Sequence, residues 1–215
     1  MPPAHALPFA WLGARARRLP GAGPGQMRGI AGPPGVGKST LAARIAAALG
    51  PDAALVPMDG FHLAEAELHR LGRHERKGAI DTFDGHGYLA LLRRLRSAGS
   101  ETVYAPEFRR EIEEPIAGAI PVPPSARLVV TEGNYLLVPE GPWREVRALL
   151  DEVWYLDLPE AERLRRLTAR HIAYGRDPET AAARARGVDQ RNAELIATTV
   201  DRADLLVRLA DSAEA

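Results

Sequence analysis

The stretch GIAGPPGVGKST, residues 29–40, holds the residues of this chain with the clearest capacity for chemistry. Four residues separate Gly32 from Gly37, and Lys38 and Ser39 follow directly, which is the spacing of a phosphate-binding loop between a strand and a helix. Glycines let backbone N–H groups point toward phosphate oxygens, and the N-terminus of the following helix adds a partial positive charge. Lys38 is expected to reach the β- and γ-phosphates, and Ser39 is expected to hold Mg²⁺ through its hydroxyl group.

This spacing predicts that ATP or a related nucleotide binds to the loop together with Mg²⁺. The alternative is an ordinary turn rich in glycine and proline, which the register of all the motif residues disfavours. The residues predicted to contact the nucleotide are Gly32, Pro33, Pro34, Gly35, Val36, Gly37, Lys38, Ser39 and Thr40.

Two carboxylates follow directly after apolar runs that are predicted to be strands. Asp59 comes after residues 54–58, and Glu132 comes after residues 128–131. Ligands gather at the carboxyl ends of the strands in doubly wound sheets, so both carboxylates are expected near Lys38. Glu132 is predicted to order the Mg²⁺ shell, directly or through water. Asp59 is predicted to be the catalytic base, which orients an acceptor hydroxyl group and takes its proton.

Each of these residues also has an ordinary interpretation. Glu132 in that case is a solvated loop carboxylate, and Asp59 belongs to a common Asp-Gly turn. His62 follows in the stretch MDGFH and is expected either to shape the acceptor pocket or to be a packed or surface histidine.

The elements that position these residues are short β-rich runs alternating with longer helical patterns, which is typical of a parallel sheet covered by helices on both faces. An α/β fold is therefore predicted. Residues 1–26 are expected to form a short amphipathic helix over 7–19 and the loop PGAGPGQ, followed by one domain over 27–215. Expected strands cover residues 27–31, 54–58, 101–104, 128–131, 152–156 and 204–209. Expected helices cover residues 39–49, 86–97, 143–150, 159–174 and 178–198.

The composition limits the classes of function. The 28 basic and 28 acidic residues cancel, so no general affinity for nucleic acid or an anionic membrane is expected. The absence of cysteine excludes disulfides, thiol nucleophiles and Cys-based metal sites. Neither a secretory signal nor an apolar run near the roughly 18 residues of a membrane span is found, so a soluble, cytoplasmic protein is expected. Lys38 and Lys77 are the only lysines, which suggests a specific role for each.

Five motifs in order, GPPGVGKST, MDGFH, RKGAIDTFD, VVTEGNYLL and RHIAYGRD, resemble the superfamily of uridine kinase, phosphoribulokinase and type I pantothenate kinase. Within it, the chain is most similar to the bacterial nucleoside/nucleotide kinase-like group, also described as fructose-transport sugar kinase-like. The resemblance covers residues 27–208. It implies a P-loop NTPase fold with three layers (α/β/α), a mostly parallel sheet and a small helical lid around residues 163–185.

The resemblance also implies an acceptor site. It matches Asp59 to the acceptor-side aspartate of the family and places KGAIDTFD at the acceptor, so Lys77 or Asp84 is expected to touch it. The stretch VYAPEFRREIEEPI supplies further candidates, unless it is a solvated loop of mixed charge. Those candidates are Phe108 and Arg109, with Tyr104 in support.

The predicted lid carries several arginines. The resemblance implies that Arg170 and Arg176 close over the phosphates and stabilise charge in the transition state. Arg163, Arg165 and Arg166 are instead expected on a solvated helix face with acidic partners one turn away.

These expectations combine into a kinase that uses ATP and Mg²⁺ to phosphorylate a hydroxyl group of a small metabolite, such as a sugar, a nucleoside or a pantothenate-like alcohol. The alternative is a switch or assembly factor that hydrolyses nucleotide while binding a protein partner. The sequence lacks the Asn-Lys-x-Asp and Leu-Ser-Gly-Gly-Gln motifs of two such classes. A nucleotide-binding module without turnover is a weaker third hypothesis. A homodimer is the default expectation for a soluble oligomer.

Overall fold

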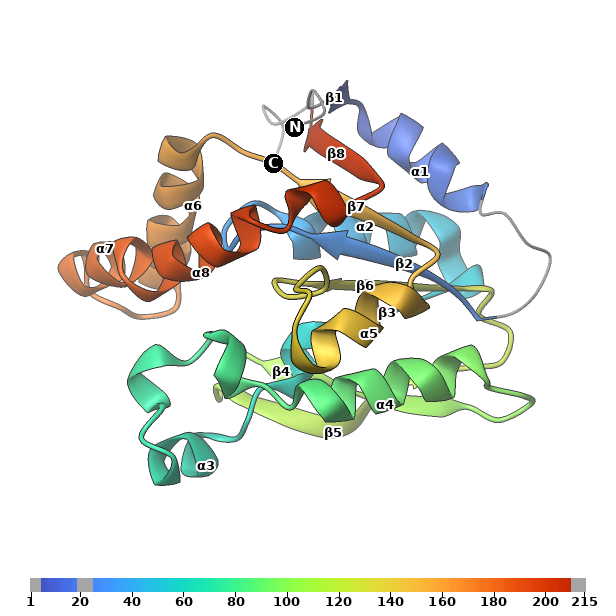
Figure 1. Cartoon of the computed structure of the whole chain (residues 1–215), viewed down its shortest axis with the longest axis horizontal. Coiled ribbons are helices and arrows are strands. Elements are labelled where there is room, and N and C mark those ends of the chain that lie inside the picture. The colour runs from blue at the N-terminus through green and yellow to red at the C-terminus, as the bar shows by residue number, and fades with distance from the viewer. Residues whose placement is uncertain (1–4, 19–24, 210–215) are drawn as a thin grey trace.

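The structure is a computed structural model that describes residues 5–18 and 25–209. Its centre is a six-stranded parallel sheet with the strand order β1-β8-β7-β2-β6-β3 (Figure 1). This confirms the predicted parallel sheet. The strands are β1 (His5–Leu7), β2 (Gln26–Ala31), β3 (Ala53–Pro57), β6 (Leu128–Gly133), β7 (Glu152–Leu156) and β8 (Leu205–Leu209).

Helices connect the strands, and short 3₁₀ turns fill several of the connections. The α-helices are α1 (Phe9–Arg17), α2 (Lys38–Leu49), α3 (Glu65–Arg70), α4 (Gly85–Arg96), α5 (Gly141–Leu149), α6 (Glu160–Ala173), α7 (Pro178–Arg186) and α8 (Val188–Ala197). The 3₁₀ helices are η1 (Gly50–Asp52), η2 (Met58–Phe61), η3 (His74–Arg76), η4 (Ile80–Thr82) and η5 (Val200–Arg202).

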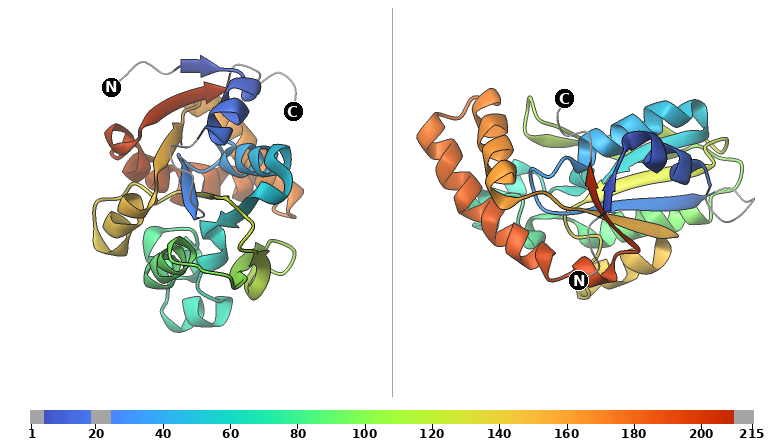
Figure 2. Two further views of the ribbon diagram at one scale, coloured as in Figure 1. Left: turned by 90° about the vertical axis from the view of Figure 1, so that its right-hand side faces the viewer. Right: turned by 90° about the horizontal axis from the view of Figure 1, so that it is seen from above.

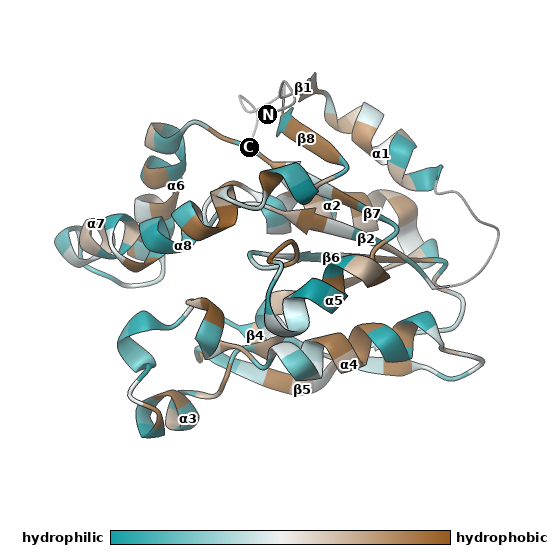
Figure 3. Ribbon diagram, in the orientation of Figure 1, coloured by the Kyte–Doolittle hydropathy of each residue, from teal (hydrophilic) through white to brown (hydrophobic). Residues whose placement is uncertain are grey.

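Alternation along the strands divides their side chains between two hydrophobic clusters, one on each face of the sheet. On one face, Ile30 and Trp154 pack with α1 and α2. On the other face, Val129 and Tyr155 pack with α4 and α5. Helices on both faces give a three-layer α/β/α arrangement (Figure 2), which confirms the predicted fold class. In Figure 3, α4 and α5 combine hydrophobic and hydrophilic residues along their length, as expected for helices with one buried face.

A second, antiparallel sheet lies outside the parallel one. It consists of β4 (Val103–Arg109) and β5 (Glu114–Val122), and it contacts η2. The predicted strand at 101–104 thus does not join the parallel sheet, and only residues 110–113 of the stretch that follows form a turn, between β4 and β5. The sequence signal for β5 is weak because this strand is mostly half-buried or exposed and contains Pro115, Gly118 and Pro121.

Helices α6, α7 and α8 extend to one side of the sheet and include the region predicted to be a lid (left in Figure 1), so these three helices are called the lid below. The single helix expected over 178–198 is divided at Gly187. Its N–H donates to the carbonyl oxygen of Ala183 at 2.8 Å, and an added Cβ would lie 2.9 Å from that same oxygen. Asp177 starts α7 by accepting a hydrogen bond from the backbone N–H of Thr180 at 2.9 Å.

The N-terminal residues are integrated with the sheet. Helix α1 lies within the expected range 7–19, and its buried Leu12 and Ala16 belong to the same hydrophobic cluster as the buried residues of α2. Strand β1 was not predicted, since three residues carry too little pattern, and it pairs with β8. Most of the predicted loop, residues 20–24, lies outside the described residues, as does residue 19 at the end of the predicted helix. Among the helices of the described ranges, none has the length and apolar character needed to cross a membrane.

Candidate active site

The phosphate-binding motif lies between β2 and α2, as its spacing predicts. Gly32, Gly35 and Gly37 have φ values of 146°, 82° and 99°, which other residues rarely adopt. A Cβ at Gly32 would lie 2.7 Å from the backbone oxygen of Leu156, so the loop needs glycine there for space as well. Among the other predicted contacts, Val36 is buried in the core, and Thr40 is exposed in the first turn of α2.

Lys38 is the first residue of α2, and its side chain returns to the loop. Its Nζ donates to the carbonyl oxygen of Pro33 at 3.0 Å and to Oδ1 of Asn134 at 2.8 Å. Burial lowers the pKa of Lys38 to about 8, although the carboxylates of Glu132 and Asp59 oppose this effect. A cation held in so little solvent is suited to an anionic ligand, because its charge is weakly screened.

Glu132 lies in β6, beside the phosphate loop. This residue is 3% exposed, and its carboxyl group accepts a hydrogen bond from the Ser39 hydroxyl at 3.0 Å. Burial and the nearby charge of Asp59 raise the pKa of Glu132 to about 7, with Lys38 acting in the opposite direction. The hydrogen bond places the two predicted metal ligands, Ser39 and Glu132, side by side. A hydroxyl and a carboxylate are oxygen donors, which suit Mg²⁺.

Asp59 lies in η2, directly after β3. Arg110 donates to its Oδ2 at 3.2 Å. Burial acts to raise the pKa of Asp59, but His62, Arg110, Lys38 and Arg170 outweigh it and hold this pKa below the usual value. His62 itself has a pKa lowered by burial, so near neutral pH the positive charge around Asp59 comes from the lysine and the arginines.

These groups open into one cavity of about 360 Å³. The phosphate loop contributes Pro34, Gly35, Lys38 and Ser39 to its wall. The predicted base, metal ligand and lid arginines that line it are Asp59, Glu132, Arg170 and Arg176. The predicted acceptor contacts that line it are His62, Lys77 and Phe108.

The predicted acceptor contacts His62, Lys77 and Phe108 form an aromatic and cationic wall of the cavity, called the acceptor wall below. The ring of His62 lies 4.6 Å from that of Phe108, and its Nδ1 lies 2.8 Å from the carbonyl oxygen of Asp59. Lys77 is 8% exposed and lies 5.0 Å over the ring of Phe108. The Lys77 ammonium also contacts the Glu65 carboxylate and donates to the carbonyl oxygen of Glu113 at 2.6 Å. Both lysines of the chain therefore face this cavity.

Three predicted acceptor contacts lie outside the cavity wall. Asp84 is the N-cap of α4 and accepts from the backbone N–H of Gly87 at 2.7 Å. Tyr104 is 56% exposed on the small sheet. Arg109 is exposed and pairs with Glu107. These side chains are used for capping or face solvent, which gives no support to the prediction that they touch the acceptor.

The arginines of α6 differ from the prediction at one position. Arg165 and Arg166 pair with Glu162, as expected for a solvated face. Arg163 is instead 3% exposed, and its guanidinium contacts the carbonyl oxygen of Pro34 at 3.4 Å and the side chain of Gln190. Arg163 thus joins the lid to the phosphate loop.

The cavity also contains residues that the sequence did not single out. Arg110 takes the position expected for its neighbour Arg109. Asn134, the residue directly after β6, accepts a hydrogen bond from the Lys38 ammonium. His171 Nε2 and Asp189 Oδ2 lie 2.8 Å apart on the lid side. Arg110 lies in the stretch VYAPEFRREIEEPI, Asn134 in the motif VVTEGNYLL and His171 in the motif RHIAYGRD, whereas Asp189 lies in none of the quoted motifs.

Comparison with known proteins places the chain among relatives described as kinases. No family model matches the chain. An "ATP-dependent kinase-like protein" of Aspergillus versicolor is 38% identical over 133 residues, which cover 59% of this chain and 77% of that protein. A "putative uridine kinase" of Schizosaccharomyces pombe is 36% identical over 156 residues, which cover 68% of this chain and 66% of that protein. The solved structure of a "putative fructose transport system kinase" from Silicibacter sp. TM1040 is 38% identical, covers 94% of this chain and 98% of its own, and has a TM-score of 0.82.

Proposed function

Because this chain belongs to the P-loop kinase superfamily of uridine kinase, phosphoribulokinase and type I pantothenate kinase, we propose that it transfers the γ-phosphate of ATP to a hydroxyl group of a small metabolite with Mg²⁺ as cofactor. One observation supports this most strongly. The carboxylate of Asp59 shares one cavity with Lys38 of the phosphate loop and with Lys77 and Phe108. A phosphate donor and an acceptor would therefore meet at Asp59.

The residues present fit Mg²⁺ and a nucleotide. Ser39 and Glu132 would hold the metal, since their hydrogen-bonded oxygens are hard donors beside the loop. Mg²⁺ supplies positive charge that offsets the charge of the phosphates during transfer. Lys38 and the loop amides would hold the phosphate oxygens, and Asn134 keeps the lysine directed toward them.

Asp59 is proposed to be the base. Its lowered pKa keeps the carboxyl group ionised at neutral pH, and Arg110 fixes its orientation. The acceptor oxygen bonds to the γ-phosphorus as the bond from that phosphorus to the β,γ-bridging oxygen breaks and ADP leaves. The acceptor proton passes to Asp59, which takes it as the new bond forms.

The lid is proposed to supply further positive charge. Arg170 and Arg176 line the cavity from α6 and the turn after it. Burial and the nearby charge of Arg110 lower the pKa of Arg170, so an anion bound beside this guanidinium would be favoured. Both arginines would stabilise charge on the transferring phosphoryl group and help to exclude water.

The acceptor is proposed to be a sugar, a nucleoside or a pantothenate-like alcohol. The aromatic rings of His62 and Phe108 offer a face for a ring or an apolar chain, and the Lys77 ammonium offers a hydrogen-bond donor. The names of the relatives, which include uridine kinase and a fructose transport system kinase, fit this range of acceptors.

The test is ADP release by the purified protein with ATP and Mg²⁺ against a panel of sugars, nucleosides and pantothenate. We expect one acceptor to stimulate turnover, and Asp59→Asn to lower that turnover about 10²–10⁴-fold while ATP still binds. Asp201→Asn, at an exposed position in η5, is the matched control and should keep full activity. ADP release that needs no acceptor and survives Asp59→Asn would contradict the proposal and favour a nucleotide-dependent switch.

A further inference from the structure

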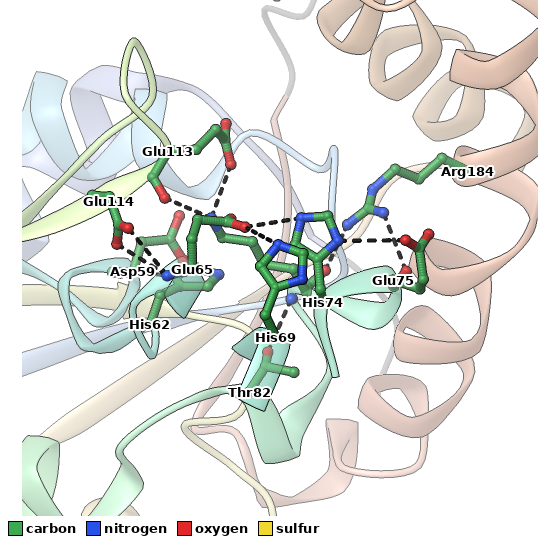
Figure 4. A network of polar contacts seen from close by, with 12 residues as sticks. Asp59, His62, Glu65, His69, His74, Glu75, Thr82, Glu113, Glu114 and Arg184 are labelled. Atoms are coloured by element: carbon green, nitrogen blue, oxygen red, sulfur yellow. Dashed lines mark hydrogen bonds and ion pairs between the residues drawn. The ribbon is translucent and has the colours of Figure 1, made fainter. Parts of the chain in front are cut away.

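A cluster of metal-ligand side chains lies beside the acceptor wall, outside the cavity. Glu65 begins α3, and His69 follows one turn later on the same face of that helix. The chain then turns at Gly72, whose φ is 65°, and returns His74 of η3 to this face (Figure 4). The three side chains thus converge over ten residues of sequence, from 65 to 74.

The distances within the cluster are close to those of a metal site, and the two stacked imidazole rings must turn relative to one another for both to direct a nitrogen at one ion. Nε2 of His74 lies 2.8 Å from Oε2 of Glu65, and Nε2 of His69 lies 3.9 Å from the same oxygen. The two imidazole rings stack with centroids 4.1 Å apart and an angle of 15° between their planes. One ligand atom from each residue lies within 4.8 Å of the others. Ligands bound at about 2.1 Å around a tetrahedral Zn²⁺ lie roughly 3.4 Å apart. This value falls between the two distances from the histidine nitrogens to Oε2 of Glu65.

We propose that Glu65, His69 and His74 bind a divalent transition metal ion of the Zn²⁺ class. Two imidazoles and one carboxylate are a common protein ligand set for Zn²⁺, with a fourth position left for water. Imidazole nitrogen favours Zn²⁺, Ni²⁺, Co²⁺ or Cu²⁺ over Mg²⁺ and Ca²⁺, which prefer oxygen. This ion is therefore distinct from the Mg²⁺ proposed beside Ser39.

The surroundings of the cluster support metal binding in two ways. The side chains of His69 and His74 are 63% and 39% exposed, so an ion can reach them from solvent. The second ring nitrogen of His74, Nδ1, lies 3.4 Å from the carboxylate of Glu75. Histidines that bind metal commonly direct their other nitrogen to a carboxylate, which fixes the ring orientation.

The site is joined to the acceptor wall through Glu65. Its Oε2 faces the histidines, while its Oε1 contacts the ammonium of Lys77, which lines the cavity. A metal on Oε2 leaves Oε1 free to keep Lys77 in place. The lid reaches the same segment, because Arg184 donates to the carbonyl oxygen of Lys77 at 2.7 Å. Bound metal would therefore tie α3 to η3 and restrain the wall against which the acceptor and the lid close.

The experiment titrates the full chain, without an affinity tag and after removal of metals, with Zn²⁺ against a chromophoric chelator. We expect one Zn²⁺ per chain, and at least about a tenfold loss of affinity in His69→Gln and in His74→Gln. His86→Gln is the matched control, because His86 is exposed on α4 away from the cluster, and it should keep the wild-type affinity. Circular dichroism of each variant verifies that it is folded.

Two outcomes would overturn the proposal. One is the absence of stoichiometric Zn²⁺ binding to the wild-type chain. The other is equal binding by wild type, His74→Gln and His86→Gln, which would mean adventitious binding by surface histidines. Co²⁺ gives an independent readout. The visible absorption of the bound Co²⁺ should indicate nitrogen and oxygen ligands at low coordination number, and His74→Gln should abolish this absorption. The titrations use no nucleotide and no acceptor, so their result does not depend on whether the proposed kinase activity is found.

Discussion

Replacement of Glu132 by glutamine tests the electrostatics of the proposed metal site. In the folded, nucleotide-free protein, burial and the charge of Asp59 raise the pKa of this carboxyl group from 4.5 to about 7. The folded state therefore binds more protons than the unfolded state between these two values. Stability contributed by the neutral carboxyl group is present at low pH and is lost as pH rises through this window.

The size of the effect follows from the shift. A difference of about 2.5 units, from 4.5 to about 7, corresponds to about 3 kcal/mol, since one unit is about 1.4 kcal/mol. Glutamine has a similar shape and can still accept from Ser39, but it carries no charge. We expect Glu132→Gln to stabilise the nucleotide-free protein by about 3 kcal/mol at pH 8 and by less than about 1 kcal/mol at pH 5. For a chain of this size, the gain at pH 8 corresponds to roughly 6–12 °C in Tm.

Thermal unfolding followed by circular dichroism at pH 5 and pH 8, without nucleotide or Mg²⁺, measures this difference. Glu140→Gln, at an exposed position before α5, is the control and should leave Tm nearly unchanged at both values of pH. The stabilised Glu132→Gln protein should also lose Mg²⁺-dependent phosphate transfer. An equal gain in Tm at both values of pH would refute the reasoning, because the gain would then come from packing and not from a buried charge.

Three further substitutions test other parts of the site. Arg110→Gln removes the cation that lies 3.2 Å from Asp59, so the pKa of Asp59 should rise. The acid limb of the pH–rate profile at saturating Mg²⁺ should then move to higher pH, and an unmoved limb would argue against this pairing. Arg170→Gln should lower kcat about 10²–10³-fold in steady-state assays, and similar kcat values for it and the solvent-facing Arg165→Gln would remove the lid arginine from the mechanism. Gly32→Ala brings a Cβ 2.7 Å from a backbone oxygen at a φ of 146°, so urea unfolding should show a loss of about 1–3 kcal/mol, and an unchanged midpoint would rule out this strain.

Local signals explain which parts of the site were predictable. The phosphate loop and the positions of Asp59 and Glu132 follow from a short apolar strand and the residues directly after it, so nearby sequence is sufficient. Arg110 was not predicted because the choice between it and Arg109 depends on which side chain faces the cavity at the end of β4. Asn134 was missed because its role exists only through contact with Lys38, which is distant in the sequence.

The same distinction applies to the fold. Strands β2, β6 and β7 are mostly buried on both faces and are rich in apolar residues, and their approximate ranges were predictable, as were those of β3 and β8. Strand β1 was too short to be predicted. The pairing of β4 with β5 was not predictable, because a half-exposed strand with two prolines and a glycine lacks that pattern. Arg163 shows the same limit on a helix. It lies one turn before Arg166 on α6, so the sequence places both on one face, but only the contacts with Pro34 and Gln190 determine that Arg163 is buried.

The two carboxylates of the site differ in pKa although they lie at the same edge of the sheet. Pro57 of β3 pairs with Glu132 of β6, so Asp59 and Glu132 emerge at the same edge of the sheet and each charge acts on the other. The cations near Asp59 keep it ionised, whereas burial leaves Glu132 near its point of half-ionisation at neutral pH. Two carboxyl groups with separated pKa values can serve as base and metal ligand at one pH. Because Glu132 must lose its proton to bind Mg²⁺, the apparent affinity for Mg²⁺ should rise with pH up to about 7 and then level off.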